Sequence, residues 1–401
     1  MRSMGVYIHI PFCVRKCAYC DFLSMPAERT RQMEYVRALK REIAQAAQRY
    51  SGRTVETVFF GGGTPSLLEA EEIAEILDCL RAQYQVDADT EITLEMNPGT
   101  AGADKLLRLR NAGVNRLSIG LQSAVNAELA LLGRIHTYED FLRTFHLARE
   151  AAFSNINIDL MSALPGQSTA GWLCTLGTVT ALEPEHISAY SLMIEEGTTL
   201  YDNLETYPAL PDEDEERHIY QVTKQFLAEK GYQRYEISNY ARPGYECRHN
   251  SIYWQRGVRH TADYVGFGLG ASSTVGAERW RNTSDMERYL QQDAAIELDY
   301  NSQKTERVCA KKTGHNAIRE DLEELSKDDR MEEFMFLGLR MTAGISKQEF
   351  EDSFGIALED IYGDVLRRWT DRNMLIQQGD QIRLTDAGID VSNVVLADFL
   401  L

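Results

Sequence analysis

The stretch VYIHIPFCVRKCAYCDF, from Val6 to Phe22, determines how the rest of the chain is interpreted. It begins as an apolar, β-rich run, and Pro11 ends the expected strand because its nitrogen has no hydrogen to donate. Cys13, Cys17 and Cys20 follow with the spacing C-x3-C-x2-C. Three thiolates from one short loop can bind three irons of a [4Fe–4S] cluster, which leaves the fourth iron without a protein ligand. An open iron predicts a ligand that chelates through its own amine and carboxylate.

Other uses of these cysteines remain as minor alternatives. A disulfide framework is disfavoured because no segment resembles a secretory signal and the remaining cysteines are scattered. A structural zinc site normally uses four Cys or His ligands, often as two pairs, and the sequence has no second C-x2-C pair. His9 lies in the strand before the loop and is poorly placed as a fourth ligand. Zinc or a plain thiol loop is therefore the weaker interpretation.

Composition limits the class of protein and its partners. The chain of 401 residues is long enough for one large domain and a small one. Its 44% hydrophobic and 26% charged residues are typical of soluble globular proteins. The formal net charge of −19 argues against nucleic acid, because phosphate binding depends on Lys and Arg. No apolar run approaches the roughly 20 residues that span a bilayer. Clustered, reduced cysteines without an export signal predict a cytoplasmic protein.

Strand-like and helix-like segments alternate along the first half of the chain. After the cysteine loop, a helix is expected over 28–50, and apolar β-rich runs follow at 54–60, 91–96, 116–120, 156–161 and 186–193, with helical stretches between them. Strands that alternate with helices predict right-handed crossovers and a parallel sheet. The expected fold class is therefore α/β, with six such units counted from Val6.

A run of three glycines follows the second expected strand. Gly61, Gly62 and Gly63 precede Thr64 and Pro65. Each glycine costs roughly 0.5–1 kcal/mol in ordering entropy relative to alanine, which a chain tolerates where its backbone passes close to something. Ser66 to Glu69 has the S-x-x-E pattern of a capping box, so a helix is expected to begin there.

Polar residues recur at or after the ends of the later strands. They are Glu95, Gln122, Asp159 and, in the segment LLGRIH, Arg134. In parallel α/β sheets, ligands bind beyond the carboxyl ends of the strands. Strand-end capping explains any one of these residues, but carboxylates within apolar strands are costly unless they are paired. As a set they predict a binding site.

The cysteine loop and its flanks resemble the radical S-adenosylmethionine (SAM) enzymes. Tyr-Ile-His-Ile-Pro-Phe-Cys before the loop, and Tyr19 inside it, are similar to the branch that contains the oxygen-independent coproporphyrinogen oxidases (HemN) and the haem chaperones (HemW). The oxidases carry one further cysteine two residues after the third, where this sequence has Phe22. They also carry a long N-terminal extension, whereas twelve residues precede Cys13 here. Both departures favour the chaperone group.

This resemblance implies a fold and a set of cofactor residues. The fold is a partial (β/α)6 barrel with added strands and a small C-terminal winged-helix-like helical domain. Cys13, Cys17 and Cys20 would hold the cluster. SAM would be bound by Tyr7, Tyr19, Gly62, Gly63, Thr64, Glu95 and Arg134, while Gln122 and Asp159 match residues that reach a second SAM in the oxidases. The resemblance gives no catalytic residue that can be named.

The segment CRHNSIYW, from Cys247 to Trp254, is the second stretch of interest. A lone histidine beside aromatic residues is normally a packing residue. Here HNSIYW resembles the HN-x-x-YW motif of the haem chaperones, in which the histidine is implicated in haem binding. His249 is therefore the expected haem ligand, and Tyr253 and Trp254 would cover an apolar face of the macrocycle.

The sequence divides into three expected parts: a radical SAM core over 1–290, a polar linker over 291–330 that includes the basic segment KKTGHN at 311–316, and a winged-helix-like domain over 331–401. The expected function is haem delivery to an acceptor protein, either soluble or membrane-associated, with an electron donor for the cluster. The rival is coproporphyrinogen III decarboxylation through a radical, and radical chemistry on another substrate stays open. Enzymatic activity and oligomeric state are not predicted.

Overall fold

The computed structural model describes residues 3–50, 52–257, 263–291 and 318–401. Six strands run parallel and neighbour one another in chain order. They are β1 (Ser3–Ile10), β2 (Thr54–Gly62), β3 (Gln85–Met96), β4 (Arg116–Gln122), β5 (Ile156–Ser162) and β6 (His186–Ser191). The strand order does not return to β1, so the sheet is an open, partial barrel. The α/β fold class expected from the sequence is confirmed.

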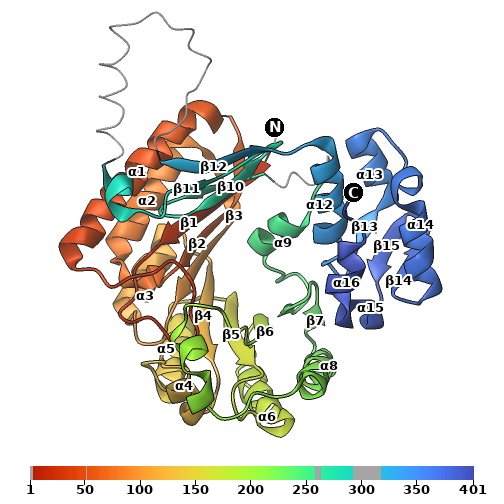
Figure 1. Cartoon of the computed structure of the whole chain (residues 1–401). Coiled ribbons are helices and arrows are strands. Elements are labelled where there is room, and N and C mark those ends of the chain that lie inside the picture. Colours follow the sequence, from red (N-terminus) through yellow and green to blue (C-terminus); the bar gives the residue numbers. More distant parts are fainter. Residues whose placement is uncertain (1–2, 51, 258–262, 292–317) are drawn as a thin grey trace, which may run out of the picture.

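Helices connect successive strands and cover the outer face of this sheet (Figure 1). They are α1 (Arg29–Tyr50), α2 (Ala70–Gln83), α3 (Ala103–Ala112), α4 (Asn126–Leu131), α5 (Tyr138–Glu150) and α6 (Thr169–Thr180). Side chains alternate along a strand, so the fully buried Val6, Ile8 and Ile10 of β1 share one face, in the core with residues of α1. Tyr7 and His9 consequently point to the opposite, concave face.

Further strands extend the sheet at both edges, to twelve strands within the described residues. β9 (Tyr264–Phe267) pairs with β1 in parallel, and an antiparallel set follows: β10 (Ser272–Val275), β11 (Glu278–Asn282) and β12 (Arg319–Glu324). Beyond β6 lie β8 (Asn239–Ala241) and β7 (Gln233–Arg234), both antiparallel. The helices between them are α7 (Thr199–Asp202), α8 (Glu213–Glu229), α9 (Arg248–Trp254) and α10 (Met286–Leu290).

Glu42 of α1 ties the added strands to the barrel. Its buried carboxylate accepts hydrogen bonds from the Gly268 N–H at 2.9 Å, the Asn282 amide at 2.7 Å and the Tyr289 hydroxyl at 2.6 Å. Burial raises the pKa of Glu42 to about 7, although these donors act in the opposite direction. One carboxyl group on a barrel helix therefore anchors β9, β11 and α10.

Three local expectations are wrong. Residues 319–324, expected within a linker, form β12. The helix expected to start at Ser66 starts at Ala70, because residues Pro65–Leu67 form a 3-10 turn and the Glu69 N–H is capped by the Glu72 carboxylate at 3.0 Å. Gly61 and Gly62 lie within β2 and not in a turn after it. The basic segment 311–316 and most of the expected linker lie outside the described residues.

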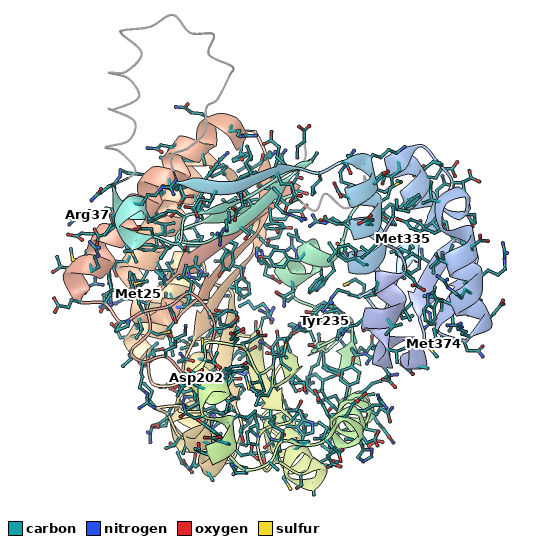
Figure 2. The ribbon with its side chains drawn as sticks, in the orientation of Figure 1. Met25, Arg37, Asp202, Tyr235, Met335 and Met374 are labelled. Atoms are coloured by element: carbon teal, nitrogen blue, oxygen red, sulfur yellow. The ribbon has the colours of Figure 1, made fainter. Side chains whose placement is uncertain are left out.

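The C-terminal region forms its own small core around a three-stranded sheet, in agreement with a winged-helix-like domain. Its elements are α12 (Lys327–Gly338), β13 (Ile345–Ser346), α13 (Lys347–Phe354), α14 (Leu358–Asp371), β14 (Leu375–Gln378), β15 (Gln381–Leu384), α15 (Asp386–Asp390) and α16 (Ser392–Ala397). Tyr235 lies where this domain meets the barrel (Figure 2), and its carbonyl accepts the Thr342 N–H at 2.9 Å. None of the helices in the described residues has the length and apolarity needed to cross a bilayer.

Candidate cofactor-binding site

The cysteine loop lies beyond the carboxyl end of β1, where the neighbouring strands place hydrogen-bond donors. The Thr64 hydroxyl lies 3.3 Å from the Cys13 sulfur, and the Arg134 guanidinium lies 3.4 Å from the Cys17 sulfur. Cys20 closes a turn with the Cys17 carbonyl at 3.3 Å. A hydroxyl and a guanidinium therefore lie within hydrogen-bond distance of two of the three sulfurs that could bind iron.

The three cysteines are chemically suited to a cubane cluster, in which each thiolate would bind one iron. All three thiols are free and partly exposed. No group of three or more His, Cys, Asp and Glu side chains in the described part of the chain is arranged around one metal ion. In a cubane each thiolate binds a different iron, so the sulfurs do not have to converge on one point. Cys13, Cys17 and Cys20 can therefore hold three corners of the cluster.

The glycine run packs directly against β1 and the cysteine loop. The Gly63 N–H donates to the Ile10 carbonyl at 2.9 Å, and a Cβ at Gly63 would lie 2.7 Å from the Phe12 carbonyl oxygen. Gly62 has φ +110°, and a Cβ there would lie 2.4 Å from the His9 ring. Close approach to other protein atoms therefore requires these glycines even before any ligand is considered.

Arg134 is the centre of a polar network above the sheet. Its guanidinium donates to Asn97 Oδ1 at 2.6 Å and to the Gly120 carbonyl at 2.7 Å, and Asn97 donates in turn to the Thr64 hydroxyl at 2.8 Å. The phenol of Tyr19 lies against the same guanidinium. A Cβ added to Gly120 would lie 3.1 Å from Gln122 Nε2, so Gln122 reaches this network too.

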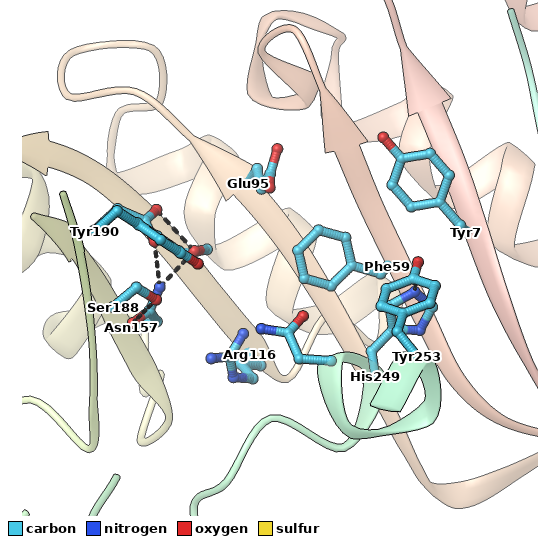
Figure 3. A pocket seen from close by; sticks show the side chains of 12 residues that line it. Tyr7, Phe59, Glu95, Arg116, Asn157, Ser188, Tyr190, His249 and Tyr253 are labelled. Carbon is cyan, nitrogen blue, oxygen red and sulfur yellow. Dashed lines mark hydrogen bonds between the residues drawn. The ribbon is translucent and has the colours of Figure 1, made fainter. Parts of the chain in front are cut away.

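Deeper in the barrel, Tyr7, Glu95, Asp159 and His249 line one cavity of about 180 Å³ (Figure 3). Glu95 accepts the Gly62 N–H at 3.1 Å, which connects this cavity to the glycine run above it. Burial and the nearby Asp159 raise the pKa of Glu95 to about 8, so Glu95 is largely protonated at neutral pH. Burial also raises the pKa of Asp159.

His249 lies at the base of this cavity, far from the cysteine loop along the strands. Its Nδ1 is 2.7 Å from the Thr57 hydroxyl and its Nε2 is 2.8 Å from the Tyr253 hydroxyl. The ring stacks on Phe59 with centroids 5.1 Å apart. Burial and the charge of Arg116 lower the pKa of His249 to about 3, so the imidazole is neutral. Both ring nitrogens are engaged by protein groups in this conformation.

The first turn of the helix that carries His249 is capped by the Glu91 carboxylate. Glu91 of β3 accepts the Arg248 N–H and the His249 N–H, both at 3.0 Å, at the start of α9. The Arg248 guanidinium donates to the Asp89 carbonyl at 2.8 Å. α9 therefore closes the amino-terminal end of the barrel, opposite the cysteine loop.

The predicted site residues fall into two groups. The structure places Tyr19, Gly62, Gly63, Thr64, Gln122 and Arg134 around the cysteine loop, and Tyr7, Glu95, Asp159 and His249 around the cavity below it. Sequence reasoning missed Asn97, Glu91 and Arg116 as site residues. Asn97 follows a strand, which is a usable signal. Arg116 begins β4, and Glu91 begins the strand expected over 91–96, at the end where ligands are not expected.

Comparisons with known proteins agree with this geometry. The family model described as "Radical SAM superfamily" matches residues 7–172, and "HemN C-terminal domain" matches residues 325–391. The chain is 33% identical to the "Heme chaperone HemW" of Bacillus subtilis over 99% of each chain, and 32% identical to that of Lactococcus lactis over 100% and 98%. A solved structure of Escherichia coli coproporphyrinogen III oxidase (HemN) superposes with TM-score 0.81 at 26% identity, covering 100% and 90% of the two chains.

Proposed function

Because the chain belongs to the HemW family of radical SAM proteins, we propose that it is a haem chaperone that carries a [4Fe–4S] cluster and SAM, binds haem and delivers it to acceptor proteins. The observation that carries this proposal is the full-length match to curated haem chaperones. Phe22, 64% exposed beside Cys20, supports it because the oxidases have a further cysteine at this position.

The residues proposed to bind the cluster and SAM lie at one end of the barrel, and the proposed haem ligand lies at the other. Cys13, Cys17 and Cys20 would hold the cluster, whose open iron accepts the amine and carboxylate of SAM. Thr64 and Arg134 keep the thiolates hydrogen-bonded, and Arg134 is itself fixed by Asn97. A reduced iron–sulfur site suits a cytoplasmic location and requires an electron donor, while the haem acceptor is either soluble or membrane-associated.

His249 remains the proposed haem ligand, and the structure adds a condition to that role. An iron bond at Nε2 requires the imidazole to leave the Tyr253 hydroxyl, and one at Nδ1 requires it to leave Thr57. Trp254 packs under the Arg340 guanidinium, with 4.5 Å between the cation and the ring centroid. We propose that haem ligation is coupled to a movement of α9 that releases these contacts.

The second candidate is the oxidase reaction, which the similarity to HemN favours. Anaerobically reconstituted protein decides between the two when one preparation is assayed for haem transfer to an apo-haemoprotein and for coproporphyrinogen consumption with SAM and a reductant. We expect transfer without consumption. Robust SAM-dependent decarboxylation would refute the chaperone proposal.

A further inference from the structure

The cavity in the barrel contains one charged side chain, Arg116, for which the described residues provide no direct hydrogen bond or ion pair, although the Glu91 and Asp159 carboxyl groups act on it from a longer distance. Arg116, the first residue of β4, is 2% exposed and lines the cavity (Figure 3). Its side chain makes no hydrogen bond and no ion pair with any described residue, and its Nε is buried without a partner. An unpaired charge in a protein interior costs several kcal/mol, so such a group normally has a partner.

Several other polar groups of the cavity are engaged with one another. Asp159 accepts from the Ser118 hydroxyl at 3.0 Å and from the Asn157 amide at 2.7 Å. Asn157 Oδ1 accepts from the Ser188 hydroxyl at 3.1 Å. No carboxylate oxygen in the described residues comes within ion-pair distance of Arg116. Its guanidinium donors therefore remain available to a ligand.

The neighbouring carboxyl groups raise the pKa of Arg116 electrostatically, but none of those in the described residues lies within ion-pair distance of it. Glu91 uses its oxygens on the backbone of α9, and Glu95 accepts the Gly62 N–H. Both Glu95 and Asp159 have raised pKa values because they are buried. A largely protonated Glu95 does not repel an incoming anion and can donate a hydrogen bond to it.

The size of the cavity limits what can enter. A volume of about 180 Å³ exceeds the roughly 10–15 Å³ that one water needs, but lies below the roughly 300–1,000 Å³ of pockets that enclose a whole small molecule. The lining residue Tyr190 is 40% exposed, so the cavity is reached beside β6. It therefore suits a short arm of a larger ligand.

We propose that Arg116 binds a carboxylate carried into this cavity on a short flexible arm and that, if the chain carries haem as proposed above, this carboxylate is a haem propionate. The planar guanidinium presents paired donors that match the two oxygens of a carboxylate. The macrocycle itself stays outside the cavity, and Arg116 fixes its orientation through one propionate. Arg116 thus binds haem through an interaction with its propionate that does not depend on an iron bond.

The first test uses a free carboxylate and needs no haem or cluster. Sodium propionate should raise the melting temperature of the protein by about 1–3 °C, relative to propionamide at the same ionic strength. Arg116→Met removes the unpaired charge, should fold at least as well, and should abolish this shift. Arg234→Met is the matched control, since Arg234 is also buried but already donates to Tyr220 at 2.9 Å. A propionate shift that persists in Arg116→Met overturns the site.

The second test identifies the source of the carboxylate with iron-free porphyrins. By fluorescence titration, the wild-type protein should bind protoporphyrin IX about 10–100-fold more tightly than its dimethyl ester, the range of a charge-assisted hydrogen bond. In Arg116→Met this preference should fall to near unity. Equal affinity of the wild type for both porphyrins overturns the propionate assignment. If neither porphyrin binds while propionate still acts through Arg116, the carboxylate site stands and the haem chaperone proposal fails.

Discussion

At the scale of single residues, the neutral, doubly hydrogen-bonded state of His249 would govern its proposed binding of haem iron. A ring nitrogen that coordinates iron cannot also accept a hydrogen bond. The hydrogen bond between His249 Nε2 and the Tyr253 hydroxyl must therefore break when Nε2 binds iron, and its loss reduces the free energy of haem binding. The net value of one such hydrogen bond is about 1 kcal/mol. A single side chain therefore tunes the rate and extent of ligation.

We predict that Tyr253→Phe increases His249 ligation. The variant keeps the aromatic ring against Tyr264 but removes the hydroxyl that holds Nε2. Ligation, followed by haem absorption in stopped flow, should be about 5-fold faster, which corresponds to the loss of one hydrogen bond. His249→Ala should remove the same spectral component, and Tyr264→Phe is the control. Identical rates in wild type and Tyr253→Phe would contradict this role.

We predict that the three loop cysteines alone are needed for the cluster. Cys13→Ala, Cys17→Ala and Cys20→Ala should each abolish [4Fe–4S] assembly, because each removes one iron ligand. Cys79→Ala and Cys174→Ala should not, since neither cysteine lies in the loop. Iron and sulfide analysis after anaerobic reconstitution measures the outcome. A full cluster in Cys17→Ala would refute the assignment.

At the scale of elements, α9 is a short helix whose position depends on a contact made by another strand. Seven residues form too few internal hydrogen bonds to be stable alone, so α9 relies on the Glu91 carboxylate at its N-terminus. The helix can therefore detach while the barrel stays folded. The proposed movement of α9 that releases the contacts of His249 requires α9 to detach in this way.

Glu91→Gln tests that dependence. The amide keeps the shape but loses the charge that strengthens both backbone hydrogen bonds, so hydrogen exchange over residues 247–254 should become about 10-fold faster. Exchange in β1 and β2 should be unchanged. Glu56→Gln is the control, because that exposed side chain is on the neighbouring strand and does not cap α9. Unchanged protection of α9 in Glu91→Gln would show that packing alone holds it.

At the scale of the whole molecule, Glu42 makes stability depend on pH. Its pKa is about 7 in the folded protein, against the ordinary value of 4.5, because burial disfavours the charged form. The unfolded chain therefore loses this proton at a lower pH than the folded protein does. The contribution of Glu42 to the free energy of unfolding is consequently lost as pH rises from 4.5 through 7. The difference between these two pKa values corresponds to about 3 kcal/mol in the free energy of unfolding.

Glu42→Gln should flatten this dependence. The amide oxygen can still accept from Gly268 and Tyr289, but glutamine does not ionise. Between pH 6 and 8.5 the melting temperature of the wild type should fall more than that of the variant, so the variant should be relatively more stable at the alkaline end. Thermal unfolding monitored by circular dichroism measures both. Parallel pH profiles would show that Glu42 does not ionise in this range.

The sequence predicted the parts of the molecule that repeat a local pattern. The strand and helix alternation was sufficient to predict the sheet, and the polar residues at strand ends predicted Arg134 but not Asn97 of the network above it. The start of α2 was predicted one turn too early, at Ser66. The Ser66 hydroxyl does not cap the helix because it hydrogen-bonds to Thr100, a contact between distant segments. Arg116 and Glu91 were missed for the same reason, since only the folded barrel brings α9, which is distant in the sequence, close to them.

The central position of β1 has a consequence for the order in which the chain is synthesised. β1 pairs with β2 on one side and with β9 on the other, and 204 residues lie between Gly62 and Phe267. At roughly 5–20 residues per second, the ribosome needs about 10–40 s to supply the second partner. During this interval β1 is an unprotected edge strand next to the cysteine loop, and such edges pair readily with other chains. The nascent protein is consequently most prone to aggregation before β9 has left the ribosome.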